Sequence, residues 1–225
     1  TISVITSEDS YLDIEFNKFG DLKEVSYEPH DEFETYTSYQ YYKSNYFTFN
    51  LVSINESTHK VKVTFSGTLY NDKTDLDSAT KTVSGTLDVS YMDVTPTVVG
   101  LDLSCKIAGN DWHATEFWDN GISEVDRKFI SDDQNQIIMV LSQEDIAVGS
   151  STFTTASENR IQLAKYNTTT HEYKVYNATA GNLTITSNTP GIFRIVQGTF
   201  SFTATNPTNP ADVIQVTNGT FKTNF

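Results

Sequence analysis

The residues best suited to binding chemistry form one aromatic segment between positions 36 and 49. Flat aromatic rings bind the faces of pyranose sugars, and they supply large contact areas in protein interfaces. The same residues would also suit a half-buried pair of strands whose rings fill the core on one side, and we favour this structural interpretation over sugar stacking. The candidate binding surface consists of Tyr36, Tyr39, Tyr41, Tyr42 and Tyr46, and the aromatic segment continues with Phe47 and Phe49.

Three aspartates, Asp72, Asp75 and Asp77, are spaced closely enough to surround a calcium ion. The segment lacks the turn glycine and the terminal glutamate of known calcium-binding loops. We therefore favour a solvated acidic loop over a calcium site.

A second group of possible metal ligands combines His113 and Glu116 with the flanking Asp111 and Asp119. Residues three apart in a strand point to opposite faces, so His113 and Glu116 do not suit one ion. Cys105 is the only cysteine, which excludes an intrachain disulfide and a cysteine-based zinc site. Its alternating apolar surroundings predict a buried, inert thiol.

The sequence contains none of the common catalytic motifs. It has no Gly-x-Ser-x-Gly, no glycine-rich phosphate loop and no His-Glu-x-x-His, and its four histidines do not cluster. A carboxylate pair for glycoside hydrolysis needs only spatial proximity, so that alternative stays open. The net charge of −14 opposes binding to nucleic acids and to anionic lipid surfaces. We therefore expect a protein that is not an enzyme and that needs no cofactor or metal.

The elements that would position these residues follow from an internal repeat. Residues 61–91 and 191–225 each contain two alternating runs that carry Gly-Thr followed by an apolar residue. Around Gly67, large apolar residues stand two positions away on either side, as Phe65 and Leu69, and a spacing of two places them on one face of a strand. Each pair of runs therefore predicts an antiparallel hairpin, with polar connections at about 71–81 and 205–211 that are too long for a two-residue turn.

The last run of the repeat departs from this spacing. Val216 lies three positions before Gly219, so Asn218 and Gly219 insert one extra residue. We expect a bulge there, with the glycine in the left-handed region. On the preceding run, Val196, Phe200 and Phe202 share a face with the repeat glycine, and this pattern predicts that they are buried.

The repeat and the strand spacing predict an all-β protein of two antiparallel, β-sandwich-like domains, each closing with a Gly-Thr-apolar hairpin. Residues 95–97, Thr-Pro-Thr, break the pattern, and we expect domains at 1–96 and 97–225, the first being a diverged copy of the second. Residues 123–130 are the only candidate for a short helical turn.

The second half of the chain carries further motifs of glycines and core aromatics. The motifs are Gly109 with Trp112 and Ala114, Gly149 before a β-run, Gly-Thr-Phe-Ser-Phe-Thr-Ala at 198–204, and Val-Thr-Asn-Gly-Thr-Phe at 216–221. The first motif also includes a small residue before Gly109, and residues 106–108, Lys-Ile-Ala, shift that small residue from its usual position.

On these motifs, residues from about 100 onward resemble a family of small, uncharacterised exported lipoproteins of Bacteroidota. The resemblance implies a β-rich fold and a location at the outer membrane, on the cell surface or on its periplasmic face, with a lipid anchor upstream of residue 1. It implies no chemistry, because the matching residues are structural. Asp77-Ser78-Ala79 is similar to the short acceptor used for O-glycosylation in that phylum, which makes Ser78 a candidate site.

Two functions remain open. The first is a non-enzymatic accessory subunit that docks onto a larger outer-membrane protein complex through the aromatic segment. The second is a carbohydrate-binding surface module that uses these tyrosines or the pair Trp112 and Trp118. The solvent exposure of these rings distinguishes the two functions. A flat row of solvent-facing rings favours glycan binding, whereas buried rings favour docking.

Overall fold

The computed structural model describes residues 1–92, 100–119, 124–131, 133–142, 146–152, 154, 157, 159–191 and 194–224, with the backbone alone at 118, 119, 124–127 and 142. The chain is all-β, and it divides into two compact units. Unit 1 comprises Thr1–Val94 with Asp132–Gln134, and unit 2 comprises Thr95–Ser131 with Asn135–Phe225. The predicted boundary between residues 96 and 97 falls outside the described residues.

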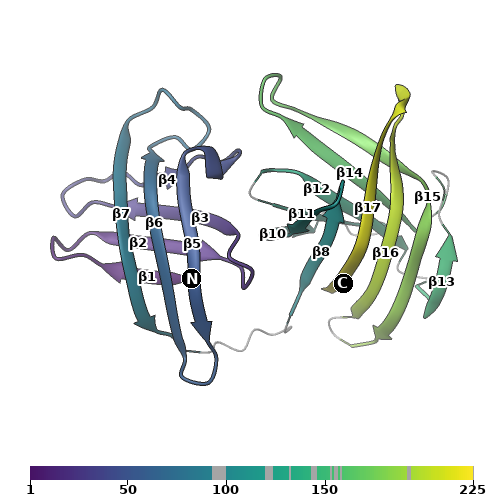
Figure 1. Cartoon of the computed structure of the whole chain (residues 1–225), viewed down its shortest axis with the longest axis horizontal. Helices are drawn as coiled ribbons and strands as arrows, with labels where there is room; N and C mark the ends of the chain where they lie inside the picture. Colours follow the sequence, from purple (N-terminus) through teal and green to yellow (C-terminus); the bar gives the residue numbers. More distant parts are fainter. Residues whose placement is uncertain are drawn as a thin grey trace. The chain divides into compact units, whose positions relative to one another are not determined.

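Unit 1 is a curled antiparallel sheet in the order β1-β2-β3-β4-β6-β5, with β7 paired to the other edge of β6 (Figure 1). It forms because short alternating runs bury one side of each strand, as Val61, Val63 and Phe65 do on β6. One short 3-10 turn, η1 (Lys43–Asn45), precedes β5. The strands are β1 (Ile2–Ile5), β2 (Tyr11–Phe16), β3 (Leu22–Glu28), β4 (Tyr36–Ser38), β5 (Phe47–Asn55), β6 (Lys60–Tyr70) and β7 (Thr80–Ser90).

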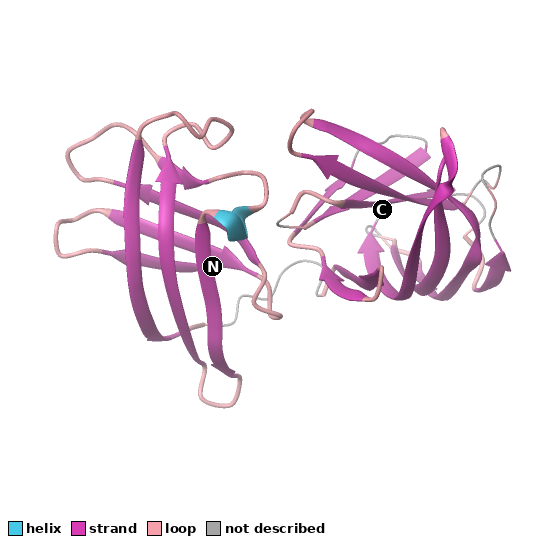
Figure 2. Ribbon diagram, turned by 45° about the horizontal axis from the view of Figure 1, so that its top comes forward, coloured by secondary structure: helices cyan, strands magenta, loops and turns pink. Residues whose placement is uncertain are grey.

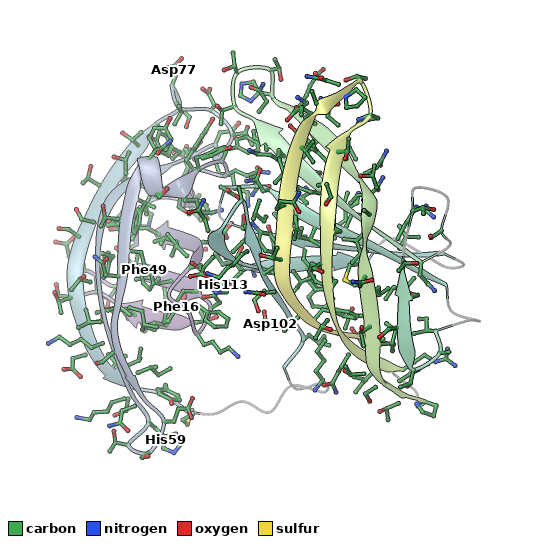
Figure 3. All side chains as sticks on the ribbon, turned by 45° about the vertical axis from the view of Figure 1, so that its right-hand side comes forward. Phe16, Phe49, His59, Asp77, Asp102 and His113 are labelled. Carbon is green, nitrogen blue, oxygen red and sulfur yellow. The ribbon has the colours of Figure 1, made fainter. Side chains whose placement is uncertain are left out.

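The first predicted hairpin is confirmed. Strands β6 and β7 pair without interruption from Lys60 opposite Ser90 to Tyr70 opposite Thr80, and residues 71–79 connect them. The core of the unit lies between this hairpin with β5 and the strands β1 to β3. Figure 3 shows Phe16 and Phe49 meeting across it, with ring centroids 4.9 Å apart.

Unit 2 is a larger antiparallel sheet in the order β10-β11-β12-β14-β15-β16-β17-β8-β9, and β13 pairs with β15 (Figure 1). Figure 2 shows the strands of this unit in magenta, joined by loops. The two ends of this path meet at a corner in the chain. The Ala114 N–H donates to Leu103 of β8, whereas the Thr115 N–H donates to Ile130 of β11. The strands are β8 (Asp102–Ile107), β9 (Asn110–His113), β10 (Glu116–Asp119), β11 (Glu124–Ile130), β12 (Gln136–Ser142), β13 (Gly149–Thr152), β14 (Arg160–Asn167), β15 (Glu172–Thr189), β16 (Ile195–Asn206) and β17 (Asn209–Asn224).

The second predicted hairpin, β16 with β17, is also confirmed. Val196, Phe200 and Phe202 are buried in the core of unit 2, as their shared face predicted. The predicted long connection at 205–211 is wrong, because the strands continue to Asn206 and Asn209 and only two residues join them. The pairing becomes irregular there, since Asn206 pairs with Asn209 while Thr205 pairs with Val213.

The predicted bulge is present, but a different residue adopts the left-handed conformation. The register shifts between Phe200, which pairs with Gly219, and Phe202, which pairs with Val216. Asn218 has φ 54°, whereas no positive φ occurs at Gly219. Asparagine tolerates this region because its short side chain bonds locally. Gly219 is needed for a different reason, since a Cβ there would meet the Phe200 ring, 2.5 Å from Cδ2.

The predicted helical turn at 123–130 is wrong from Glu124 onward, where the chain forms strand β11; Ser123 lies outside the described residues. This strand pairs with β10 on one side and β12 on the other, so tertiary pairing overrides the local helical tendency. Among the described residues, no helix is long and apolar enough to span a membrane.

Candidate binding surface

The aromatic segment is not a continuous pair of strands. Strand β4 ends at Ser38, a loop with the turn η1 follows, and β5 begins at Phe47. Tyr42 adopts the left-handed region, with φ 48° and ψ 55°, where it caps the start of η1. The loop therefore directs successive tyrosines in different directions.

The five candidate tyrosines differ in exposure. Tyr36 and Tyr39 are buried, at 4% and 7% of their full accessibility. Tyr41, Tyr42 and Tyr46 are half-buried. Only the latter three can present ring surface to a partner, and the buried Tyr39 packs against Tyr41 and Tyr46.

The rings in this loop pack edge to face. Tyr39 contacts Tyr46 with centroids 5.0 Å apart at 72° and Tyr41 at 5.7 Å and 79°, while Tyr46 contacts Tyr70 at 6.2 Å and 88°. We call Tyr39, Tyr41, Tyr46 and Tyr70 the tyrosine cluster. Near-perpendicular rings do not make the flat platform on which a sugar stacks.

Tyr70 was not predicted as a member of this group. It stands at the end of β6, far from the other tyrosines in sequence, and β6 brings it next to β4, where it pairs with Thr37. The only sequence signal is its place at the end of the first hairpin run. The non-local pairing of β4 with β6 was not readable from that signal.

Two acidic loops border the aromatic segment. The Tyr36 hydroxyl lies 3.0 Å from Glu32 Oε2 and 3.1 Å from Glu34 Oε2. Lys81 Nζ donates to Glu32 at 2.6 Å and lies 5.2 Å from the centre of the Tyr36 ring. The loop at 31–34 is thereby held against Tyr36 and the start of β7.

The second acidic loop, at 72–77, lies on the tyrosine cluster. The Gln40 N–H donates to the Lys73 carbonyl oxygen at 2.8 Å. Burial is the main cause that raises the pKa of the Tyr39 phenol, and the neighbouring Tyr46, Tyr41 and Tyr70 add to it. The negative charge of Asp75 in this loop raises the pKa of Tyr39 further. The two loops therefore place acidic residues on two sides of a half-exposed aromatic surface.

A hollow of about 350 Å³ lies in the first acidic loop, and no sequence motif indicated it. Phe33 is fully exposed beside it and Tyr11 is 54% exposed. Its lining is otherwise mostly polar or acidic: Asp9, Tyr11, Glu28, Pro29, His30, Glu32, Phe33, Glu34 and Thr35.

Burial is the main reason why the tyrosines in this region resist ionisation. It raises the pKa of Tyr36 to about 12, and hydrogen bonds to Glu32 and then Glu34 add to the effect because a phenolate would repel both carboxylates. Burial likewise raises the pKa of Tyr42 and Tyr70 above the ordinary value.

We expect phenolate absorbance during alkaline titration to include a late step near pH 12 that is missing from Tyr36→Phe. The folded pKa lies above the ordinary value of 10.0, so the folded state holds this proton more tightly than the unfolded state. The associated stability is complete below pH 10 and is lost as pH rises towards 12. If the two proteins differ only by a step near pH 10, Tyr36 is not shielded.

The three aspartates of the second acidic loop organise their own backbone. Asp72 Oδ1 accepts from the N–H and the hydroxyl of Thr74, at 2.9 and 2.7 Å. Asp75 Oδ1 accepts from the Asp77 N–H at 2.9 Å. Figure 3 shows Asp77 at the outer end of its loop. These bonds direct two of the carboxylates to separate turns.

Ser78, the candidate glycosylation site, is engaged in the same loop. Its hydroxyl donates to the Asp75 carbonyl oxygen at 2.8 Å and lies 3.3 Å from the Asp72 N–H, which can donate to it. An attached glycan would have to replace these bonds. Glycosylation of Ser78 therefore stays a prediction, and it would disturb the hydrogen bonds that hold this loop.

The other possible ligands are separated or occupied. Asp111 pairs with Lys106 at 2.6 Å, and this bond lowers the pKa of its carboxyl. His113 is on β9, opposite Ser104 of β8, whereas Glu116 begins β10. In the described parts of the chain, no three His, Cys, Asp or Glu side chains come close enough to hold a metal ion.

Cys105 and Trp112 both belong to the core of unit 2. Burial raises the pKa of the Cys105 thiol to about 12, so the reactive thiolate is disfavoured, and the prediction of a buried thiol is confirmed. Trp112 is 7% exposed and offers no surface to a glycan. The side chain of Trp118 lies outside the described residues.

Comparison of the chain with protein-family models, with curated proteins and with solved structures finds no match.

Proposed function

We propose that this protein is a non-enzymatic accessory subunit, exported and anchored to the outer membrane through a lipid upstream of residue 1, that docks onto a larger membrane-protein complex. The observation that carries the proposal is the contact of both acidic loops with the aromatic segment, through Tyr36 on one side and Gln40 on the other. Half-exposed rings inside a charged border are typical of a protein-binding surface.

The chemistry of this surface defines the partner. Tyr41 and Tyr46 supply rigid contact area at little entropic cost, and both rings are already fixed by their contacts with Tyr39. The carboxylates on either side favour arginine and lysine side chains, which also bind well to exposed ring faces such as that of Phe33. The partner therefore presents a basic surface with an apolar centre.

The test is copurification of the partner complex from native membranes with the full, anchored protein. We expect Tyr41→Ser with Tyr46→Ser to abolish it while leaving the fold intact, because both rings are partly exposed. Tyr39 is left unchanged, since its burial makes it a supporting residue. Tyr173→Ser, which changes a 38% exposed tyrosine of unit 2, is the matched control and should copurify normally.

The same proteins also distinguish the carbohydrate-binding alternative. Retained copurification by the double variant, together with saturable binding of a glycan by the unmutated protein, would replace docking by glycan recognition. If the double variant and the Tyr173→Ser control lose copurification equally, the effect is not specific to the aromatic segment.

A further inference from the structure

Strand β7 forms an open edge of the unit 1 sheet. Its eleven residues pair with β6 in one unbroken register, and no other described strand pairs with it. Figure 1 shows it as the last strand on its side of the sheet. Alternate N–H and C=O groups of such a strand point away from the sheet and can pair with another chain.

The other edges of this sheet carry the features that normally prevent edge pairing, whereas β7 lacks them. Strand β1 has only four residues, and β5 is interrupted by a register shift between Leu51 and Ser53. Strand β7 has no proline and no bulge, and its one lysine, Lys81, is paired with Glu32. Long, regular edges without such protection are the ones that recruit a further strand.

The core is also incompletely covered along this edge. Val61, Val63 and Phe65 on β6 are at most 6% exposed. Val89 and Leu87 on β7, opposite Val61 and Val63, pack against the same core but are only half-buried, and so is Val83, opposite Gly67. A strand added beside β7 would cover this apolar row.

The sequence of β7 is complementary to itself. If two copies pair antiparallel about Gly85, Val83 faces Leu87 on the core side and Ser84 faces Thr86 on the outer side. Thr82 then faces Asp88, and Lys81 faces Val89, so no like charges are opposed. Both apolar pairs and hydroxyl pairs stabilise antiparallel strands.

Charge at the two ends of β7 favours the same arrangement. Asp72, Asp75 and Asp77 lie in the loop that leads into the first end, where Lys73 and Lys81 are paired with Glu24 and Glu32. Beside the last end, Lys60 lies opposite Ser90, and Lys62 lies opposite Asp88. Antiparallel pairing brings the acidic end of one copy to the basic end of the other. We propose that β7 pairs with β7 of a second copy of this chain across a two-fold axis at Gly85.

The dimer should be weak and reversible. An interface made by one strand edge is smaller than the roughly 1,200 Å² of a stable complex, and the net charge of −14 on each copy opposes approach. A dissociation constant in the range of about 10 µM to 1 mM is expected. Sedimentation velocity of the full chain across this range should show monomer converting to dimer.

The decisive variant is S84K/T86K, which places two pairs of opposed lysines at the axis on an exposed face. We expect the dissociation constant to rise by at least about tenfold. The matched control, T64K/S66K, adds the same charges to the same face of β6, where Ser66 pairs with Ser84 and Thr64 with Thr86. Its lysines lie about 14 Å from those of the second copy, beyond the Debye length, so it should dimerise normally.

A complementary pair of variants tests the register. S84E/T86E should also be monomeric alone, but mixing it with S84K/T86K should restore a heterodimer, because each lysine then faces a glutamate. Amide exchange should show the outward N–H groups of β7 becoming protected as dimer forms. The proposal is overturned if the unmutated protein stays monomeric throughout this concentration range, or if S84K/T86K dimerises with unchanged affinity. It is also overturned if the control T64K/S66K loses as much dimer affinity as S84K/T86K.

Discussion

Phe200→Ala is expected to destabilise unit 2 by about 3–5 kcal/mol, the range for removing a fully packed phenylalanine. Phe200 is 4% exposed and lies 6.1 Å from Phe202 and 6.3 Å from Phe221, measured between ring centroids. Its ring also covers Gly219 on the neighbouring strand. Neither the glycine nor a pleated strand can collapse into the space left behind, so the cavity adds to the lost burial.

Tryptophan fluorescence during chemical denaturation measures this change cleanly. Both tryptophans of the chain, Trp112 and Trp118, belong to unit 2, so the signal follows the unfolding of that unit. Thr199→Ala, one position earlier and exposed, is the control and should stay within about 0.5 kcal/mol. A loss below about 1 kcal/mol for Phe200→Ala would mean that this ring is not a core residue.

Gly198→Ala should also destabilise unit 2, by about 1–3 kcal/mol, although alanine is usually the better strand residue. Strand β15 approaches so closely here that an added Cβ would overlap the Thr184 carbonyl oxygen and lie 2.7 Å from Phe221 Cε1. The carbonyl oxygen belongs to a backbone paired on this side, so it cannot move away without disturbing the ladder.

Gly85→Ala is the control, because Gly85 is a glycine of the same repeat, on the second strand of the first hairpin. Its added Cβ would meet only the end of the Phe65 ring, at 3.0 Å, on the edge strand β7. A small shift of that ring suffices, and the entropy gained by replacing glycine offsets its cost, so a change below about 1 kcal/mol is expected. Equal effects at Gly198 and Gly85 would contradict the role of the close backbone approach.

The strands of the repeat were readable from local pattern alone. Side chains in a strand alternate with a period of two, so the positions of Val196, Phe200 and Phe202 in the sequence already determine that they share one face. The extra residue before Gly219 likewise had to disturb pairing wherever the strand lay. Local pattern did not determine which residue takes the left-handed conformation, because both asparagine and glycine tolerate it. In the structure Asn218 adopts it, and Gly219 lies against the Phe200 ring.

Features that depend on distant pairing were decided only by the tertiary structure. Residues 124–130 became a strand because β10 and β12 pair with both of its edges. The ends of the unit 2 sheet meet because Ala114 and Thr115 donate to different strands. Backbone hydrogen bonds carry no sequence signature of their own, so such partners cannot be read from one run of residues.

The candidate surface shows the same division. The sequence identified a tyrosine-rich segment and the acidic loop at 72–77, since residue type is a local property. The tertiary structure decided that Tyr36 and Tyr39 are buried, that Tyr70 joins the cluster from β6, and that Tyr41, Tyr42 and Tyr46 keep part of their surface. Burial depends on which segments cover a side chain, and those segments are brought there by strand pairing between residues far apart in the chain.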